Sequence, residues 1–152
     1  MKNFNNINEI LDFAIEREQR AVDLYTILSV DSANHEMKEV FFEFAKEEMN
    51  HKALLIKVKE EGTGTFEKME ITDMKIADYI VPENKPHEEL TYPEALKLAM
   101  WREKAAYNLY KKLASIVNDV SFKNLFESLA NEELKHKNRF EKEYDDYVLR
   151  EN

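Results

Sequence analysis

Hydrophobic residues recur at steps of three and four along most of the chain, the spacing at which side chains share one face of an α-helix. The pattern fills two segments, about residues 7–61 and 92–147, and turn signals near residues 30–33 and 118–119 break each segment once. The sequence therefore predicts an all-α fold with two helical hairpins, joined by a long crossover link over residues 62–91. At this length we expect one domain over residues 1–152.

Several helix boundaries carry signals of their own. Thr91 stands three residues before Glu94 with a proline between them, the capping-box pattern that opens a helix. Gly62 and Gly64 are expected to end the second helix, because glycine is the usual residue just past a helix end. We expect one short helix at residues 73–80 of the link, and residues 144–152 are expected to fray or pack loosely.

Polar side chains interrupt the apolar faces near the middle of each predicted helix. A carboxylate and an imidazole three residues apart project from the same face of a helix, so both can reach one ion. Buried and unpaired carboxylates would cost on the order of several kcal/mol each, and divalent cations would remove that cost. The candidate metal ligands are Glu18, Glu48, His51, Glu103, Glu133 and His136.

These candidates form two copies of one pattern, separated by a constant 85 residues. The Glu-x-x-His motif occurs at residues 48–51 and 133–136, and a lone glutamate on the preceding helix accompanies each copy. The midpoint between the lone glutamate and the glutamate of the motif falls at residue 33 in one hairpin and 118 in the other. Both midpoints lie at predicted turns, so each hairpin should bring its three side chains to the same height.

Composition excludes several classes of function. The net charge of −9, without a long basic block, argues against nucleic acids and anionic membranes as partners. No apolar run approaches the roughly 18 residues of a membrane span, and the N-terminus lacks a signal-peptide core, so we expect a cytoplasmic protein. The chain has no cysteine, which excludes disulfides and thiolate metal sites. Oxygen and nitrogen ligands without sulfur suit Fe or Mn.

With these motifs the chain resembles the ferritin-like superfamily, and within it the rubrerythrin type, over about residues 7–145. The motifs are Glu18-x-x-Ala21-x-x-x-Tyr25, Glu48-x-x-His51, Glu103 with Tyr110, and Glu133-x-x-His136. The resemblance implies a ferritin-like four-helix bundle that holds two Fe ions, with Mn as the alternative. The implied roles are terminal or bridging ligands for Glu18 and Glu103, bridging ligands for Glu48 and Glu133, and caps on one iron each for His51 and His136.

Two features differ from the peroxide-reducing members of that family. Ala106 stands where those proteins carry a further glutamate, and the chain contains no cysteine-rich rubredoxin domain. We therefore expect an external electron donor. Tyr25 and Tyr110 are candidates for hydrogen-bonding partners near the metals, and core aromatic residues are the alternative reading.

The remaining histidines and neighbouring glutamates stand outside the pattern. His35 and His87 are not part of the repeat, and we expect both to face solvent. The glutamates next to the proposed ligands point to other sides of their helices, and we expect them on the surface. They are Glu16, Glu47 and Glu132.

These observations predict an oxidoreductase of the peroxidase or ferroxidase type. Its metal centre would react with hydrogen peroxide or oxygen, in oxidative stress or iron metabolism. An iron-binding protein of the ferroxidase or storage type is one alternative, and a metal-free helical interaction module is another. We expect a homodimer that buries Trp101 or Phe42, and an exchange of hairpins between the two copies is compatible with the long link.

Overall fold

A computed structural model describes residues 2–32, 34–66, 68–69, 71, 73–83 and 85–151. The first hairpin consists of α1 (Ile7–Asp31) and α2 (His35–Phe66), and the second of α3 (Tyr92–Ile116) and α4 (Val120–Glu151). Two 3₁₀ helices, η1 (Ile76–Tyr79) and η2 (His87–Glu89), lie between the hairpins. Within the described ranges there is no strand, so the predicted all-α class is confirmed.

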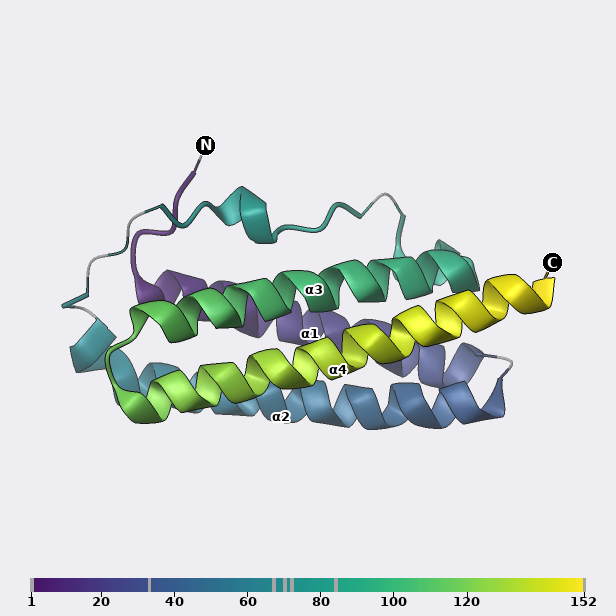
Figure 1. Ribbon diagram of the computed structural model, residues 1–152, viewed down its shortest axis with the longest axis horizontal. Helices are drawn as coiled ribbons and strands as arrows, with labels where there is room; N and C mark the ends of the chain where they lie inside the picture. The colour runs from purple at the N-terminus through teal and green to yellow at the C-terminus, as the bar shows by residue number, and fades with distance from the viewer. Residues whose placement is uncertain are drawn as a thin grey trace. The chain divides into compact units, whose positions relative to one another are not determined.

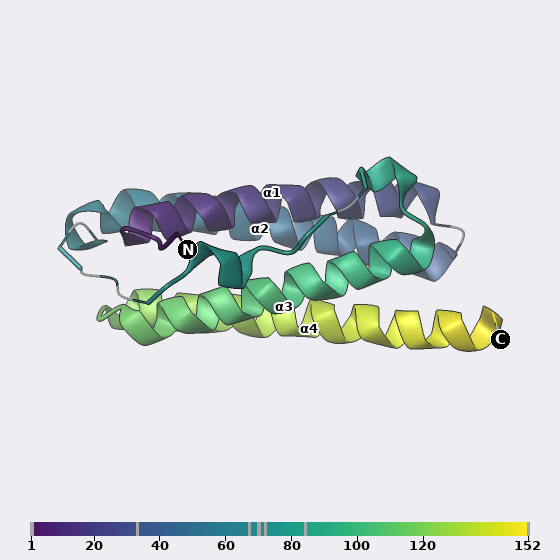
Figure 2. The same ribbon diagram turned by 90° about the horizontal axis from the view of Figure 1, so that it is seen from above.

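Each hairpin belongs to a compact unit of its own, Met1–Asp78 for the first and Tyr79–Asn152 for the second. Figures 1 and 2 show α1 lying beside α2 and α3 lying beside α4. The two units correspond to the two copies of the repeated pattern. Their union into one domain stays a prediction.

The first unit packs the predicted apolar faces of α1 and α2 against each other. Polar contacts at the edge of this interface link the two helices: Lys52 Nζ donates to Gln19 Oε1 at 2.7 Å, and Lys59 Nζ donates to Asp12 Oδ1 at 2.6 Å. The buried residues that follow the pattern are Ile7, Ile10, Ala14, Ala21, Tyr25 and Leu28 on α1 and Met37, Phe41, Leu55 and Val58 on α2.

The turn of this hairpin is short, and side chains and backbone cap the helices on both sides of it. The N–H of Ser32 donates to the carbonyl of Leu28 at 3.1 Å, and Asn34 Oδ1 accepts from the N–H of Met37 at 3.2 Å. Asn is common just before the first residue of a helix because its side-chain oxygen satisfies a free backbone N–H of the first turn. The predicted midpoint, Ala33, lies outside the described residues.

The N-terminal segment and the start of the link pair within the same unit. The N–H of Phe4 donates to the carbonyl of Met74 at 2.9 Å, and the N–H of Ile76 donates to the carbonyl of Lys2 at 3.0 Å. The side chains of Phe4 and Met74 are both buried. The short helix expected at residues 73–80 is therefore smaller than predicted and is limited to η1. Part of the segment forms backbone hydrogen bonds with the N-terminal residues instead.

The second unit begins at the predicted capping box. Thr91 Oγ1 accepts from the N–H of Glu94 at 3.3 Å, and Glu94 Oε1 accepts from the N–H of Thr91 at 3.0 Å. At the turn, Asp119 Oδ1 accepts from the N–H of Phe122 at 3.1 Å and caps the start of α4. Both caps occur where the sequence predicted a helix start.

The predicted end of the second helix near Gly62 is wrong, because α2 continues to Phe66. Gly62 is buried against the ring of Phe66, and a Cβ atom at this position would overlap Phe66 Cε2. The glycine therefore provides space for a buried ring one turn later in the same helix. Its role is close packing within the helix, which the sequence pattern alone does not distinguish from a stop signal.

The prediction that residues 144–152 fray is wrong as far as Glu151, where α4 ends. The alternative, loose packing, agrees with residues 144–150, none of which is buried, and Asn152 lies outside the described residues. Tyr92 Oη donates to Glu143 Oε2 at 2.9 Å, and Arg150 Nη2 donates to the same oxygen at 3.1 Å. The rings of Tyr92 and Tyr147 meet edge to face, with centroids 5.2 Å apart. These contacts hold the last turns of α4 against the start of α3. None of the helices in the described part of the chain could cross a membrane.

Candidate metal centre

In the first unit, α1 and α2 bring three of the predicted ligands together. His51 Nδ1 lies 3.4 Å from Glu48 Oε1 and 3.7 Å from Glu18 Oε2. Each of the three side chains offers a ligand atom, and those atoms lie within 4.8 Å of one another. All three residues are at most 2% exposed, so this cluster is removed from bulk water.

Burial and mutual charge change the acid–base behaviour of this cluster. Burial, followed by the charge of Glu48, raises the pKa of Glu18 well above its usual range. Burial alone would lower the pKa of His51, but the hydrogen bonds and charges of Glu18 and Glu48 together outweigh it and raise that pKa to about 11. In the metal-free chain the imidazole of His51 is therefore protonated at neutral pH. Its positive charge faces the same two carboxylates that a cation could bind.

In the second unit, α3 and α4 form the equivalent cluster. His136 Nδ1 lies 3.5 Å from Glu103 Oε1, and Glu133 adds a second carboxylate from the helix that carries His136. The ligand atoms of these three side chains again lie within 4.8 Å of one another, and all three residues are at most 3% exposed. The six residues predicted as ligands thus form one buried cluster in each hairpin.

The donor set of each cluster fits a divalent ion of the Fe or Mn type. Two carboxylates and one neutral imidazole supply oxygen and nitrogen ligands and two negative charges, which match the charge of one divalent cation. Neither cluster contains sulfur, since the chain has no cysteine. The residues therefore fit the metal that the sequence pattern indicated.

Both tyrosines that were predicted near the metals are buried. Tyr25 is 0% exposed and Tyr110 is 1% exposed. The ring of Tyr25 stacks on that of Phe41, with centroids 6.4 Å apart. This packing matches the reading of Tyr25 as a core aromatic residue, and a role for either hydroxyl near a metal stays a prediction.

The glutamates beside the predicted ligands lie where we expected them, because Glu16, Glu47 and Glu132 are all exposed. His35 is confirmed as solvent-facing, with a side chain that is 87% exposed. The prediction for His87 is wrong, since only 16% of its side chain is exposed.

The position of His87 follows from contacts with residues distant in sequence. Its Nε2 atom lies 3.0 Å from Arg102 Nη2, and Arg102 also forms an ion pair with Glu83. These contacts fasten the link to α3 one residue before Glu103. No local signal in the sequence indicates them, because they join residues that are 15 or more positions apart.

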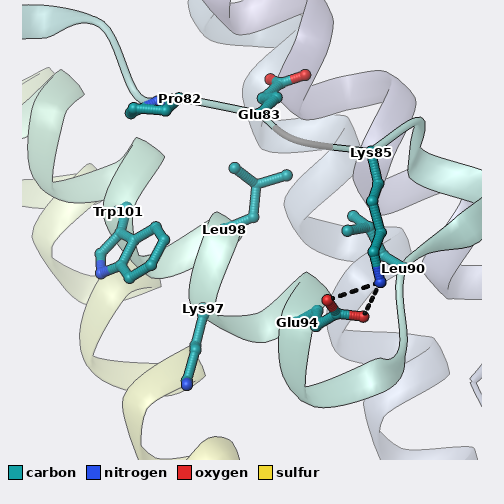
Figure 3. Close-up of a pocket in the computed structure, with 8 residues that line it drawn as sticks. All are labelled: Pro82, Glu83, Lys85, Leu90, Glu94, Lys97, Leu98 and Trp101. Atoms are coloured by element: carbon teal, nitrogen blue, oxygen red, sulfur yellow. Dashed lines mark hydrogen bonds and ion pairs between the residues drawn. The ribbon is translucent and has the colours of Figure 1, made fainter.

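A pocket of about 290 Å³ lies between the link and α3 in the second unit (Figure 3). Both carboxylates at its wall have cationic partners: Glu94 is bound by Lys85, and Glu83 is paired with Arg102. The pocket therefore offers no free carboxylate to a ligand, and sequence reasoning did not predict it. Its lining residues are Pro82, Glu83, Lys85, Leu90, Glu94, Lys97, Leu98 and Trp101.

Comparison with known proteins agrees with this fold. A solved structure, described as a hypothetical protein from Pyrococcus furiosus, is 27% identical to the chain with a TM-score of 0.70. The alignment covers 91% of this chain and 87% of that one. No curated protein matches the chain. Residues 9–144 match the rubrerythrin family, which confirms the predicted ferritin-like four-helix class. The match extends through all four helices and both clusters, and on that evidence the chain belongs to the rubrerythrin family.

Proposed function

We propose that this protein is a di-iron carboxylate oxidoreductase, with di-manganese as the alternative, whose metal centre reacts with hydrogen peroxide or oxygen. The observation that carries the proposal is the pair of buried Glu-Glu-His clusters, one in each hairpin. The proposed ligands are Glu18, Glu48 and His51 in the first hairpin and Glu103, Glu133 and His136 in the second. Membership of the rubrerythrin family supports the same assignment.

The electrostatics of the clusters support a cation as their partner. A buried glutamate is costly when charged, and four of them occur here at most 2% exposed. Two divalent ions would balance the four negative charges. The bridging roles proposed for Glu48 and Glu133 come from the resemblance to the family, and they require the two ions to be close neighbours.

When bound, two Fe(II) ions would supply the two electrons that reduction of an O–O bond requires. The protein residues have other tasks. The carboxylates hold the charge of the site near neutral, and the imidazole of His51 must release a proton before its ring nitrogen can bind an ion. The buried surroundings keep bulk water away from the site. An external electron donor would restore the reduced state.

Metal content per chain tests the proposal directly. The protein is loaded with Fe(II) under anaerobic conditions, desalted and measured by elemental analysis. We expect about two ions per chain in the wild type and fewer than half as many in a Glu48→Gln, Glu133→Gln double variant, which keeps the side-chain volume but removes two ligand charges. The matched control is Glu47→Gln, Glu132→Gln, because these exposed neighbours should not affect loading.

Two results would contradict the proposal. One is a wild type that holds no metal after loading, which would leave a helical interaction module. The other is equal loading of the ligand variant and the control variant. If two ions are bound, magnetic coupling between them, measured by Mössbauer or EPR spectroscopy, tests the bridging roles of Glu48 and Glu133.

The oxidant is identified with the loaded protein. Hydrogen peroxide or oxygen is mixed with the reduced protein, and oxidation of iron is followed by absorbance. We expect about one peroxide consumed for every two irons oxidised, because each iron gives one electron. Oxidation that is no faster than that of the same iron free in buffer would refute an enzymatic role.

A further inference from the structure

An exposed indole forms one wall of the pocket between the link and α3. Trp101 is 55% exposed, and it stands three residues after the buried Leu98. Figure 3 shows Trp101 at one end of the pocket and the pair of Lys85 and Glu94 at the other, with Leu98 between them. The volume of about 290 Å³ is close to the lower end of the range for small-molecule pockets. The pocket can therefore take a small ligand that packs against one aromatic ring.

The charges around this pocket do not cancel. Its two carboxylates, Glu83 and Glu94, are both paired with cations. Lys97 has no carboxylate partner within the described ranges, and its Nζ atom lies 5.4 Å from the centre of the Tyr144 ring. The lining of the pocket therefore includes one positive charge that no negative group balances.

This unbalanced charge is particular to the second hairpin. At the constant offset of 85 residues, Lys97 and Tyr144 correspond to Asp12 and Lys59. Asp12 and Lys59 form an ion pair at 2.6 Å in the first hairpin. The second hairpin thus has a cation over a ring where the first has a neutral pair, and such a contact at an exposed position is weak. The ammonium group of Lys97 remains available to an anion.

The exposed indole is also particular to the second hairpin. Trp101 and Ala105 correspond to Glu16 and Arg20 at the same offset. Glu16 and Arg20 form an ion pair at 3.2 Å on the surface of α1. The first hairpin therefore shows that the fold does not require a large aromatic ring at this position, so the ring calls for another explanation.

We propose that this pocket binds a small planar aromatic compound with one negative charge, such as an aromatic carboxylate. The ring of the ligand packs against Trp101 and Leu98, and its anionic group binds Lys97. Lys97 stands four residues before Trp101, so the two side chains share one face of α3, and the flexible stem of lysine lets its ammonium group follow the ligand. A cationic ligand would find no unpaired carboxylate here. The site is separate from the metal centre and does not depend on bound metal.

Three probes with the same carbon skeleton separate the roles of charge and ring. They are 2-naphthoate, the neutral 2-naphthamide and the saturated decahydro-2-naphthoate. Binding to the full chain, treated with a chelator, is followed by NMR through the indole N–H of Trp101, because the chain has no other tryptophan. We expect 2-naphthoate to bind with a dissociation constant of about 1 mM or lower, and each of the other two to bind at least about threefold more weakly. No change in this signal at about 10 mM 2-naphthoate, or equal binding of all three probes, would refute the site.

Single substitutions test the cation and the ring, with calorimetry as the measurement. Lys97→Gln should weaken 2-naphthoate about threefold to fivefold and remove the preference over 2-naphthamide. Trp101→Leu should weaken both aromatic probes to a similar degree. The matched control is Lys104→Gln, because Lys104 is an exposed lysine of α3 that does not line the pocket. A Lys97→Gln protein that binds 2-naphthoate as well as the control would overturn the proposal.

A double variant provides a second test that does not depend on loss of packing. Lys97→Asp with Trp101→Glu gives α3 the side chains that α1 carries at the equivalent positions, so the helix should still form, and circular dichroism checks this. We expect no measurable binding of 2-naphthoate, since an unpaired cation and a ring have both been removed. Undiminished binding would overturn the proposal. An affinity of the wild type that falls as the protein concentration rises would do so as well, because it would mean that a second copy of the chain covers Trp101.

Discussion

His51 Nδ1 lies 3.4 Å from Glu48 Oε1, so the imidazole and the carboxylate of the repeated motif already face each other in the metal-free chain. The distance to Glu18 Oε2 is similar, at 3.7 Å. A proton on His51 and a cation at this site would interact with the same two carboxylates. The proton on His51 and a metal ion therefore compete for the same two carboxylates.

This competition predicts that metal binding releases protons. His51, with a pKa raised to about 11, is protonated at neutral pH and must lose that proton before its nitrogen can bind an ion. The raised pKa of Glu18 also favours proton release on metal binding, because Glu18 must be deprotonated to bind an ion. Metal affinity should consequently increase as the pH rises toward 11.

Calorimetric titration with Mn(II), in buffers that differ in heat of ionisation, measures the number of protons released. We expect at least one proton per ion bound in the first hairpin. His51→Gln should release fewer protons and bind more weakly. A metal affinity that does not change with pH would contradict the competition.

A second prediction concerns Glu18 in the metal-free protein. A group whose pKa is raised by folding contributes stability at low pH and loses it as the pH rises through the folded pKa, so the charged form of Glu18 opposes folding. Glu18→Gln should therefore increase the free energy of unfolding by about 1 kcal/mol near neutral pH. The same change should reduce metal binding.

Urea unfolding in the presence of a chelator measures this effect, and the exposed neighbour Glu16 provides the control as Glu16→Gln. After metal loading the order should reverse, since ligand present at 100 times its dissociation constant adds about 2.7 kcal/mol to the wild type. A Glu18→Gln protein that is less stable than the wild type without metal would show that the carboxylate supports the fold.

The four helices and the two clusters could be predicted because their signals are local and repeated. The apolar spacing of three and four residues identifies a helix face without knowledge of its partner. Glu18 and Glu103 stand out because each interrupts such a face at the same position in its copy. The capping box from Thr91 to Glu94 is likewise complete within four residues.

The predictions that failed depend on contacts that no local pattern contains. The sequence pattern predicts a helix end at Gly62, and only the contact of Gly62 with the ring of Phe66 shows why a glycine stands within α2. His87 reads as a surface residue, and Arg102 on α3 determines its burial. The last turns of α4 are helical, and Tyr92, about fifty residues earlier, donates a hydrogen bond to Glu143 there.

The contact between Gly62 and Phe66 leads to a third prediction. In Gly62→Ala the new methyl group would overlap the buried ring of Phe66, so the free energy of unfolding should fall by about 1–3 kcal/mol. Gly64→Ala is the matched control, because a Cβ atom there has no neighbour within 4 Å. Since Gly64 is exposed within a helix, its replacement should raise stability by about 0.5–1 kcal/mol. Equal effects at the two positions, measured by urea unfolding, would refute the packing role of Gly62.

The fourth prediction concerns the start of α3. The backbone hydrogen bond from Thr91 and the ammonium group of Lys85 lower the pKa of Glu94 to about 2. A carboxyl group whose pKa is lowered by folding stabilises the protein above its unfolded pKa of about 4.5, and it loses this contribution as the pH falls through about 2.

Glu94→Gln should therefore lower the urea midpoint at neutral pH, because glutamine lacks the charge that Thr91 and Lys85 stabilise. The difference from the wild type should shrink as the pH falls below 4.5 and vanish only below 2, where Glu94 itself becomes neutral. Glu88→Gln, at an exposed position in η2, controls for a general loss of negative charge. A difference that stays constant over this pH range would mean that the side chain of Glu94 acts by shape alone and that its charge adds nothing to the cap.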